Sequence, residues 1–194
     1  MAFAVIAGYA DAVGYLRFKA FAGMMTGNTV LMGLATFGHA ELPVWGYAVL
    51  LGLFFVAAAA SYRALPYLAP AWLLGLEAAL IILADLITDD RGIVPLVLAM
   101  GIQNPVATRM GVPLNTTFIT GNILRFAEGL ARWLHHPSAH LSQPFGIFGL
   151  VWLGYAVGAA LGTGAYRLTA WPSVIPVALL VFIFAWGHRR AASP

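Results

Sequence analysis

The chain has 194 residues, of which 61% are hydrophobic and 9% are charged, far below the roughly 25% of charged residues in an average soluble domain. This composition indicates an integral membrane protein and leaves no stretch long enough for a soluble domain. The net charge of +3 comes from scattered basic residues, which argues against nucleic-acid binding, and the lack of cysteine excludes disulfides, thiol catalysis and cysteine metal ligands.

Six apolar segments are candidates for crossing a bilayer, which takes ~20 residues for a hydrocarbon core of ~30 Å. The first runs from Met1 to about Leu16. It is short for a span and begins at the first residue, which indicates a clipped or misassigned start, and it lacks the basic start and cleavage site of a signal peptide. The other five cover residues 43–62, 69–88, 92–108, 144–165 and 171–187. The sequence therefore predicts an all-α membrane protein with about six transmembrane helices.

Asp11 is a carboxylate within the first of these segments. A charge in the middle of a span costs ~2.5–3.5 kcal/mol on insertion scales, so such residues usually face a cavity and mark an ion, proton or substrate path. We expect Asp11 to contribute to solute binding and to be a candidate for proton coupling. The alternatives are that it lies near the membrane surface, or that it only caps or pairs with a neighbouring helix.

The tripeptide Thr-Gly-Asn occurs twice, at Thr26-Gly27-Asn28 and Thr120-Gly121-Asn122. Short segments, 20–25 and 115–119, precede the two copies. At 1.5 Å per residue, helices over 26–38 and 120–132 would each be ~20 Å long, too short to cross the bilayer. We therefore predict two short half-helices in addition to the spans.

The starts of these half-helices are the predicted solute site. Thr is a preferred N-cap, glycine permits a close backbone approach, and the free amides of a first turn attract anions or polar atoms. Broken helices at corresponding positions of a duplicated membrane protein indicate a transporter's binding site. The expected substrate-binding residues are Asp11, Thr26, Gly27, Asn28, Gln103, Asn104, Thr120, Gly121 and Asn122. The alternative is that Thr-Gly-Asn only caps two short helices where their ends cross.

Further similarities between the two halves indicate an internal duplication. Asp11 precedes Thr26 by nearly the interval that separates Asn104 from Thr120. The run Gly46-Tyr47-Ala48-Val49 recurs as Gly154-Tyr155-Ala156-Val157, and Ser61-Tyr62-Arg63 corresponds to Ala165-Tyr166-Arg167. We predict two membrane repeats, residues 1–91 and 92–194, which together form one transmembrane domain.

The relative orientation of the repeats depends on the half-helices. If they re-enter from one side, the repeats are inverted; if each crosses together with the preceding extended segment, the repeats are parallel. The inverted arrangement is preferred, because the half-helix starts then meet at the midplane. It places Arg63, Arg109, Arg132, Arg189 and Arg190 on one face and Arg17, Lys19, Arg91 and Arg167 on the other, which is too even to orient the protein.

Glu77 is a second carboxylate within a span and a second candidate for coupling. It could pair with an arginine such as Arg125 or accept a proton; a hydrogen-bonded acid with a packing role is the alternative. Arg125 and Glu128 are three apart on the second half-helix and are expected to pair. Arg132 and His135 place the outer end of that helix at the membrane surface.

Gly154, Gly158 and Gly162 form a stripe of small residues that lets another helix approach closely. The stripe is equally suited to packing within one protomer and to packing between two, so a homodimer is one expectation. His135, His136 and His140 have no carboxylate at ligand spacing, and we expect neither a metal site nor a cofactor.

Two stretches resemble a known family. The run Ala-Gly-Tyr-Ala-Asp-Ala-Val-Gly-Tyr followed by Met25-Thr26-Gly27-Asn28-Thr29-Val30, and Met100-Gly101-Ile102-Gln103-Asn104 followed by Thr117-Phe118-Ile119-Thr120-Gly121-Asn122, resemble the YoaK-like family of bacterial integral membrane proteins (domain of unknown function 1275). The resemblance covers nearly the whole chain and includes Glu77, although the amino terminus is shorter than is usual in that family. It implies a bacterial inner-membrane protein of about six spans without an established activity.

Three function classes are open. The leading hypothesis is a small secondary transporter or channel-like permease for a small polar or anionic solute, bound between the Thr-Gly-Asn helix starts near mid-membrane and proton-coupled through Asp11. The second is a non-transporting scaffold or a protein that senses lipid or a partner, in which protein contacts would seal the half-helix ends. An enzyme is not expected, since no Ser/His, paired-Asp or metal constellation is visible.

Overall fold

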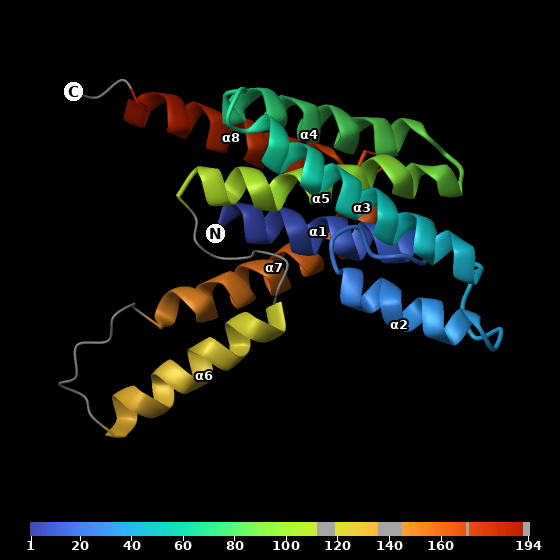
Figure 1. Ribbon diagram of the computed structural model, residues 1–194, viewed down its shortest axis with the longest axis horizontal. Helices are drawn as coiled ribbons and strands as arrows, with labels where there is room; N and C mark the ends of the chain where they lie inside the picture. The colour runs from blue at the N-terminus through green and yellow to red at the C-terminus, as the bar shows by residue number, and fades with distance from the viewer. Residues whose placement is uncertain (112–118, 136–144, 170, 192–194) are drawn as a thin grey trace.

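The computed structural model describes residues 1–111, 119–135, 145–169 and 171–191, the last six of them by backbone alone. These residues form eight α-helices and one short 3-10 helix, and no strand occurs among them (Figure 1). The elements are α1 (Ala2–Phe18), α2 (Met25–Ala35), α3 (Val44–Ala64), α4 (Pro70–Leu86), η1 (Asp90–Gly92), α5 (Ile93–Arg109), α6 (Ile119–His135), α7 (Gly146–Leu168) and α8 (Val174–Ala191). The all-helical prediction is confirmed.

Each of the six predicted apolar segments is a helix, namely α1, α3, α4, α5, α7 and α8. Within the described residues, α3 and α7 are long and apolar enough to cross a membrane. Helices α1, α4 and α5 have 17 residues each, which is the lower end of the ~17–25 residues of membrane-spanning helices. The count of six transmembrane helices therefore stays a prediction.

Backbone chemistry explains where several helices begin and end. Lys19 follows α1 in the left-handed conformation with φ of 56°, and its carbonyl accepts a hydrogen bond of 3.2 Å from the Tyr47 hydroxyl. Gly38 has φ of 75°, which glycine adopts without a steric penalty, and closes the turn after α2. Pro70 opens α4 at a position where no amide hydrogen bond is lost.

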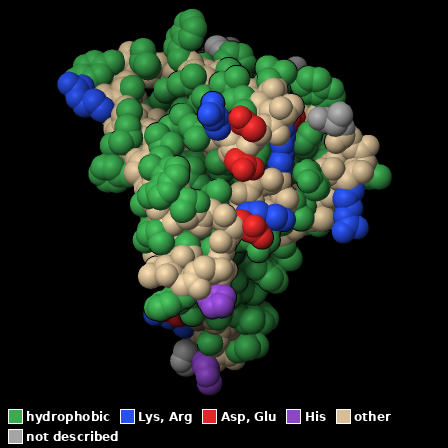
Figure 2. All heavy atoms as spheres, turned by 90° about the vertical axis from the view of Figure 1, so that its right-hand side faces the viewer, with side chains coloured by type: hydrophobic (Ala, Val, Ile, Leu, Met, Phe, Trp, Pro, Cys, Tyr) green, Lys and Arg blue, Asp and Glu red, His purple; other side chains and the backbone are tan. Residues whose placement is uncertain are grey.

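The six main helices run lengthwise through the molecule. Each helix of the first half runs in the opposite direction to the corresponding helix of the second half, counted in chain order. Helices α1, α4 and α7 run one way, and α3, α5 and α8 run the other way (Figure 1). The end at which α4 passes into α5 carries acidic and basic side chains surrounded by hydrophobic ones (Figure 2). The exposed charged residues of the connections at this end are Lys19, Glu41, Asp89, Asp90 and Arg91.

Helices α1 and α5 each pack closely on a helix from the other half of the chain. Helix α1 packs mainly on α7, and α5 packs on α3 and α4. The glycine stripe of α7 lies against α1: a Cβ at Gly158 would overlap the Val5 carbonyl, and one at Gly162 would lie 2.7 Å from the Tyr9 carbonyl oxygen. The stripe thus packs within the chain, which was one of the two arrangements expected for it.

The two shorter helices lie beside the main ones, α2 on α3 and α6 on α7. Both begin part-way along the molecule and run toward opposite ends (Figure 1). Helix α2 has 11 residues, in line with the predicted length, whereas α6 has 17 and exceeds the predicted 120–132. The N-cap of α2 is Met24 rather than Thr26.

Some expectations fall outside the described residues. They concern most of the extended segment 115–119, the loop that contains His136 and His140, and the side chains of Arg189 and Arg190.

Candidate functional site

Asp11 lies in the middle of α1 and binds the start of α2. Its side chain is buried, with the residue 2% exposed. One carboxylate oxygen accepts hydrogen bonds from the backbone N–H groups of Gly23 (2.6 Å) and Met24 (3.0 Å), and the other accepts from the Tyr155 hydroxyl (2.6 Å). A negative charge at a helix N-terminus is stabilised by the helix dipole and by amides that have no partner within the helix. From α1, Asp11 therefore holds the N-cap residue of α2, Met24, and the residue before it, Gly23.

The loop between α1 and α2 brings these amides to Asp11. After the left-handed turn at Lys19 the chain returns along α1, where Ala20 and Ala22 are fully buried. Gly14 makes room for this return, because a Cβ there would lie 2.9 Å from the Ala20 carbonyl oxygen. Helix α2 consequently starts beside the centre of α1. Asp11 already holds the amides at this start, which explains why α2 does not need Thr26 as its N-cap.

The first Thr-Gly-Asn tripeptide contacts the same loop. Asn28 is fully buried, and its amide group accepts a hydrogen bond from the Phe21 N–H (2.9 Å) and donates one to the Phe21 carbonyl (2.8 Å). A Cβ on Gly27 would lie 2.7 Å from the Phe21 ring, so this ring covers the glycine. Thr26 is exposed. Gly27 and Asn28 thus hold the loop whose Gly23 and Met24 amides bind Asp11.

The second tripeptide shows a similar pattern of exposure. Asn122 is 4% exposed, whereas Thr120 is exposed, as Thr26 is in the first copy. Gln103 is fully buried in α5, and its side-chain NH₂ donates a hydrogen bond of 3.0 Å to the Phe3 carbonyl at the start of α1. Asn104 is half-buried. Helices α2 and α6 do not pack extensively against each other in the described part of the chain, so a solute site shared by both tripeptides stays a prediction.

Glu77 is the second buried carboxyl group of a main helix. It is fully buried, and neither of its carboxyl oxygens has a hydrogen-bond partner among the described residues. The pair with Arg125 that the sequence allows is not formed, since that guanidinium lies over the Phe148 ring at 5.5 Å, and the hydrogen bonds of the alternative interpretation are not found among the described residues either. The possible pair of Arg125 with Glu128 is not formed: Glu128 pairs with Arg132 at 2.6 Å, one helical turn further on.

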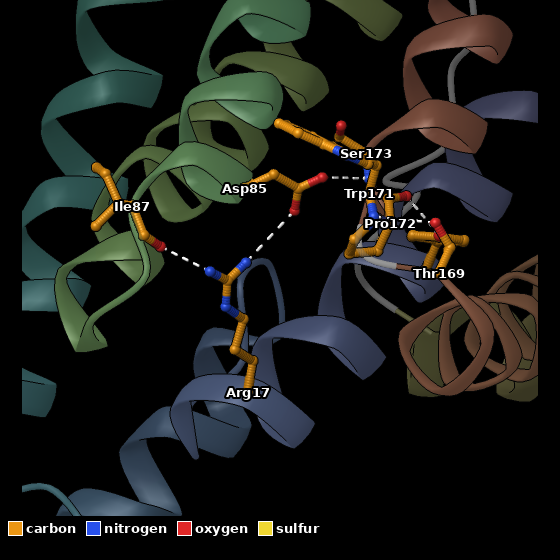
Figure 3. Close-up of polar contacts among 8 residues, drawn as sticks. Arg17, Asp85, Ile87, Thr169, Trp171, Pro172 and Ser173 are labelled. Carbon is orange, nitrogen blue, oxygen red and sulfur yellow. Dashed lines mark hydrogen bonds and ion pairs between the residues drawn. The ribbon is translucent and has the colours of Figure 1, made fainter.

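A third polar cluster, built around Asp85, was not predicted from the sequence (Figure 3). One oxygen of Asp85 lies 3.5 Å from the Arg17 guanidinium, and the other accepts a hydrogen bond of 2.7 Å from the Ser173 N–H. Arg17 also donates to the Ile87 carbonyl at 2.7 Å. The cluster ties the end of α1 to the end of α4 and to the link before α8, which is a structural role. An acid near the end of one apolar segment and an arginine near the end of another were its only sequence signal.

A polar cavity of about 300 Å³ opens between the ends of α1 and α2 and the start of α3. Its lining includes Tyr15, Lys19, His39, Glu41 and Tyr47. The Tyr15 ring stacks on Phe21 with 5.0 Å between ring centroids. The loop that binds Asp11 through its amides is therefore in contact with the wall of this cavity.

Among the described residues no group of three His, Cys, Asp or Glu side chains is arranged to hold a metal ion. The polar groups beside the start of α2 are the Gly23 and Met24 amides and the Tyr155 hydroxyl, all of which donate to Asp11. The side chains that line the cavity at Lys19 are the other polar groups near this loop.

Comparison with known proteins gives two matches. The family described as "Protein of unknown function (DUF1275)" matches residues 1–186. A curated relative, described as a UPF0700 transmembrane protein of Rhizobium meliloti (strain 1021), is 30% identical over 197 residues, which cover 97% of this chain and 86% of that protein. No solved structure matches the chain.

Proposed function

This chain belongs to the DUF1275 family of membrane proteins, whose description assigns no activity, and we propose that it is a small secondary transporter or channel-like permease. The proposed substrate is a small polar or anionic solute, and the proposed location is the bacterial inner membrane. A proposal on function has to come from the chain's own geometry, since a family of unknown function supplies no substrate.

The observation that carries the proposal is the bond between Asp11 and the start of α2. Two backbone amides there bind a carboxylate at 2.6 and 3.0 Å. Helix N-termini bind carboxylate, phosphate and sulfate by the same contacts, so the start of α2 is an anion site in which the anion is a side chain of the protein. A small anionic solute would compete with Asp11 for these amides.

Proton coupling follows from this competition. Hydrogen bonds to an ionised carboxylate are roughly twice as strong as those between neutral groups. A proton on Asp11 would therefore weaken its bonds to Gly23 and Met24 and leave their amides to the solute. Acid is then expected to favour anion binding, and solute and proton would move together.

The arrangement of the helices supports two inverted repeats, 1–91 and 92–194. If α1, α2, α3 and α4 correspond to α5, α6, α7 and α8, the main helix contacts have equivalents. The packing of α1 on α7 corresponds to that of α5 on α3, and the packing of α2 on α3 corresponds to that of α6 on α7. Corresponding helices also run in opposite directions (Figure 1). Gly8 of α1 and Gly101 of α5 occupy equivalent positions. Gly8 lies against the Tyr155 carbonyl of α7, and Gly101 lies against the Phe54 carbonyl of α3. Broken helices within inverted repeats are typical of transporters.

One observation favours a second candidate function, that of a membrane scaffold or a protein that senses lipid or a partner. Asp11 and the Phe21 ring seal the start of α2 by direct protein contacts. On α6, Leu124 and Leu134 are 65% and 64% exposed, and the exposed side chains of Glu128 and Arg132 pair with each other. A helix that exposes both apolar and charged side chains is suited to the membrane interface.

Uptake by proteoliposomes separates the two candidates. We expect the parent protein to take up at least one of a panel of small anions and neutral polar solutes, faster at acidic than at neutral pH outside. Asp11→Asn should remove the pH dependence while the protein stays folded and inserted. The matched control is Asp90→Asn, which removes an exposed carboxylate at the α4–α5 connection. No uptake of any solute would favour the scaffold, and unchanged pH dependence in Asp11→Asn would make Asp11 purely structural.

A further inference from the structure

Glu77 is a buried carboxyl group without a hydrogen-bond partner among the described residues. It lies halfway along α4, on the face that also carries the buried residues Leu73, Leu74 and Ile81. The residue has no exposed surface, and neither carboxyl oxygen has a partner among the described residues. Asp11 is different, because both of its oxygens accept hydrogen bonds. Glu77 therefore contributes nothing to the packing that an apolar side chain would not provide.

Among the described residues, no ion pair or hydrogen bond reaches Glu77 from the elements around α4, and the charged residues of α1, Asp11 and Arg17, are held by other partners. Helix α5 carries one charged residue, Arg109, at its C-terminal end, and the described side chains of α8, residues 174–185, carry none. Asp90 and Arg91 of η1 are exposed at the end of the molecule. On α4 itself, Asp85 is bound to Arg17 and to the Ser173 N–H. A negative charge on Glu77 would thus be buried without compensation.

In the proposed repeat, the position that corresponds to Glu77 in the other half is apolar. Pro66 and Pro70 have the same spacing as Pro172 and Pro176, and with these prolines aligned Glu77 corresponds to Ile183 in α8. Ile183 packs against the hydrophobic core of the molecule. An apolar side chain therefore serves in one half at the place where the other half has a buried acid.

We propose that Glu77 is a proton-binding site: it carries a proton in the arrangement observed and gives the proton up to water when water reaches α4. An unpaired carboxylate in apolar surroundings is strongly disfavoured, and such a group neutralises instead. A metal cation is a poor alternative occupant, because it needs several oxygen ligands and the described neighbours of Glu77 on α4 are apolar. The use of this proton in transport rests on the proposed function; its binding by Glu77 does not.

Infrared spectroscopy of the protein in a detergent without ester or carboxyl groups tests the proposal without a substrate. A protonated carboxyl group absorbs as a carbonyl, apart from ionised carboxylates. We expect this band at neutral pH in the parent and in Glu128→Gln, which removes an exposed acid, and its loss in Glu77→Gln. Glu77→Leu serves as a second variant, because the equivalent position holds isoleucine. A parent without the band, or a band that persists in both Glu77 variants, would overturn the proposal.

Labelling of the parent protein with a hydrophobic carbodiimide is an independent test of whether Glu77 is protonated. This reagent modifies protonated carboxyl groups in apolar surroundings. Mass spectrometry with fragmentation of the modified peptide should place the adduct on Glu77 and not on Asp85, which shares the segment between Arg63 and Arg91, or on Asp11. Adduct on the latter two with none on Glu77 would contradict the proposal. Failure of solute uptake with a positive infrared band and adduct would reject the permease and leave the proton site standing.

Discussion

Asn28 holds the loop between α1 and α2 with both ends of its amide group. The two partners are the N–H and carbonyl of Phe21, and the Phe21 ring in turn covers Gly27 and stacks on Tyr15. Loss of the Asn28 side chain would leave a backbone donor and a backbone acceptor without partners. The position of the amides that bind Asp11 therefore depends on Asn28, although Asn28 does not contact Asp11 in any bond described above.

Asn28→Ala is expected to loosen this loop. A buried polar group left without a partner costs ~1–3 kcal/mol, so we expect a lower thermal unfolding temperature and faster hydrogen exchange at the amides of residues 20–24. The control is Thr29→Ala, since Thr29 is exposed and its hydroxyl donates only to the Met25 carbonyl one turn earlier. Equal exchange rates in the two variants would show that Asn28 does not hold the loop.

At the level of residues, the sequence indicates which side chains are unusual but not what they bind. Asp11 and Glu77 stand out in apolar segments because ionisable groups are rare there. The partners of Asp11 come from a loop that folds back and from Tyr155, 144 positions away, so they depend on packing that no local pattern encodes. The pair of Glu77 with Arg125, which the sequence left open, is not formed for the same reason: α6 packs on α7, away from α4.

At the level of elements, the close packing of α1 on α7 positions Asp11 beside Tyr155. Backbone meets backbone at several points of this contact, since Gly8 of α1 lies against the Tyr155 carbonyl and Gly158 of α7 lies against the Val5 carbonyl. Helices in a membrane gain stability from such close approach, because lipid provides no hydrophobic drive for their association. The glycine stripe was visible in the sequence, whereas its partner helix could be found only from the fold.

Gly158→Ala should destabilise the molecule, although alanine is the better helix former. The added Cβ would overlap the Val5 carbonyl, and only a separation of the two helices would relieve that overlap. We expect a loss of ~1–3 kcal/mol or more from overpacking, seen as a lower unfolding temperature in detergent. Gly164→Ala lies on the same helix with nothing within 4 Å of the added atom, and should be neutral or stabilising by up to ~1 kcal/mol. Equal effects of the two substitutions would exclude the α1–α7 contact.

Helix positions were predicted to within a few residues because prolines, glycines and charges interrupt the apolar runs at Pro43, Pro70 and Gly92, each at the start of a helix. The ends of α2 and α6 were less well predicted. Helix α2 begins at Met25, where Asp11 of α1 binds the two preceding amides, and α6 extends to His135, three residues beyond the predicted end. A tertiary contact therefore outweighs the local capping preference at the start of α2.

At the level of the whole molecule, the positions of the helix ends favour inverted over parallel repeats. Helix α2 starts beside the middle of α1, where Asp11 binds it, and runs toward the end at which α1 finishes (Figure 1). Between α1 and α3 the chain thus returns to the end of the molecule at which α1 finishes (Figure 1). Arg63 and Arg109, at the ends of α3 and α5, lie at the end opposite to Lys19 and Arg91 (Figure 1), as the inverted arrangement predicts.

Single cysteines test this topology directly, because the parent chain has none. With a membrane-impermeant thiol reagent on oriented vesicles, we expect Lys19→Cys, Phe37→Cys and Asp90→Cys to react from one side and Arg63→Cys and Arg109→Cys to react from the other. Phe37 decides between the two arrangements, since it is 81% exposed just after α2. In the inverted arrangement α2 returns to the side of Lys19. In the parallel arrangement α2 with its preceding segment crosses the bilayer, and Phe37→Cys would react with the opposite side from Lys19→Cys. That result would remove the re-entrant helix and, with it, the midplane anion site proposed at the start of α2.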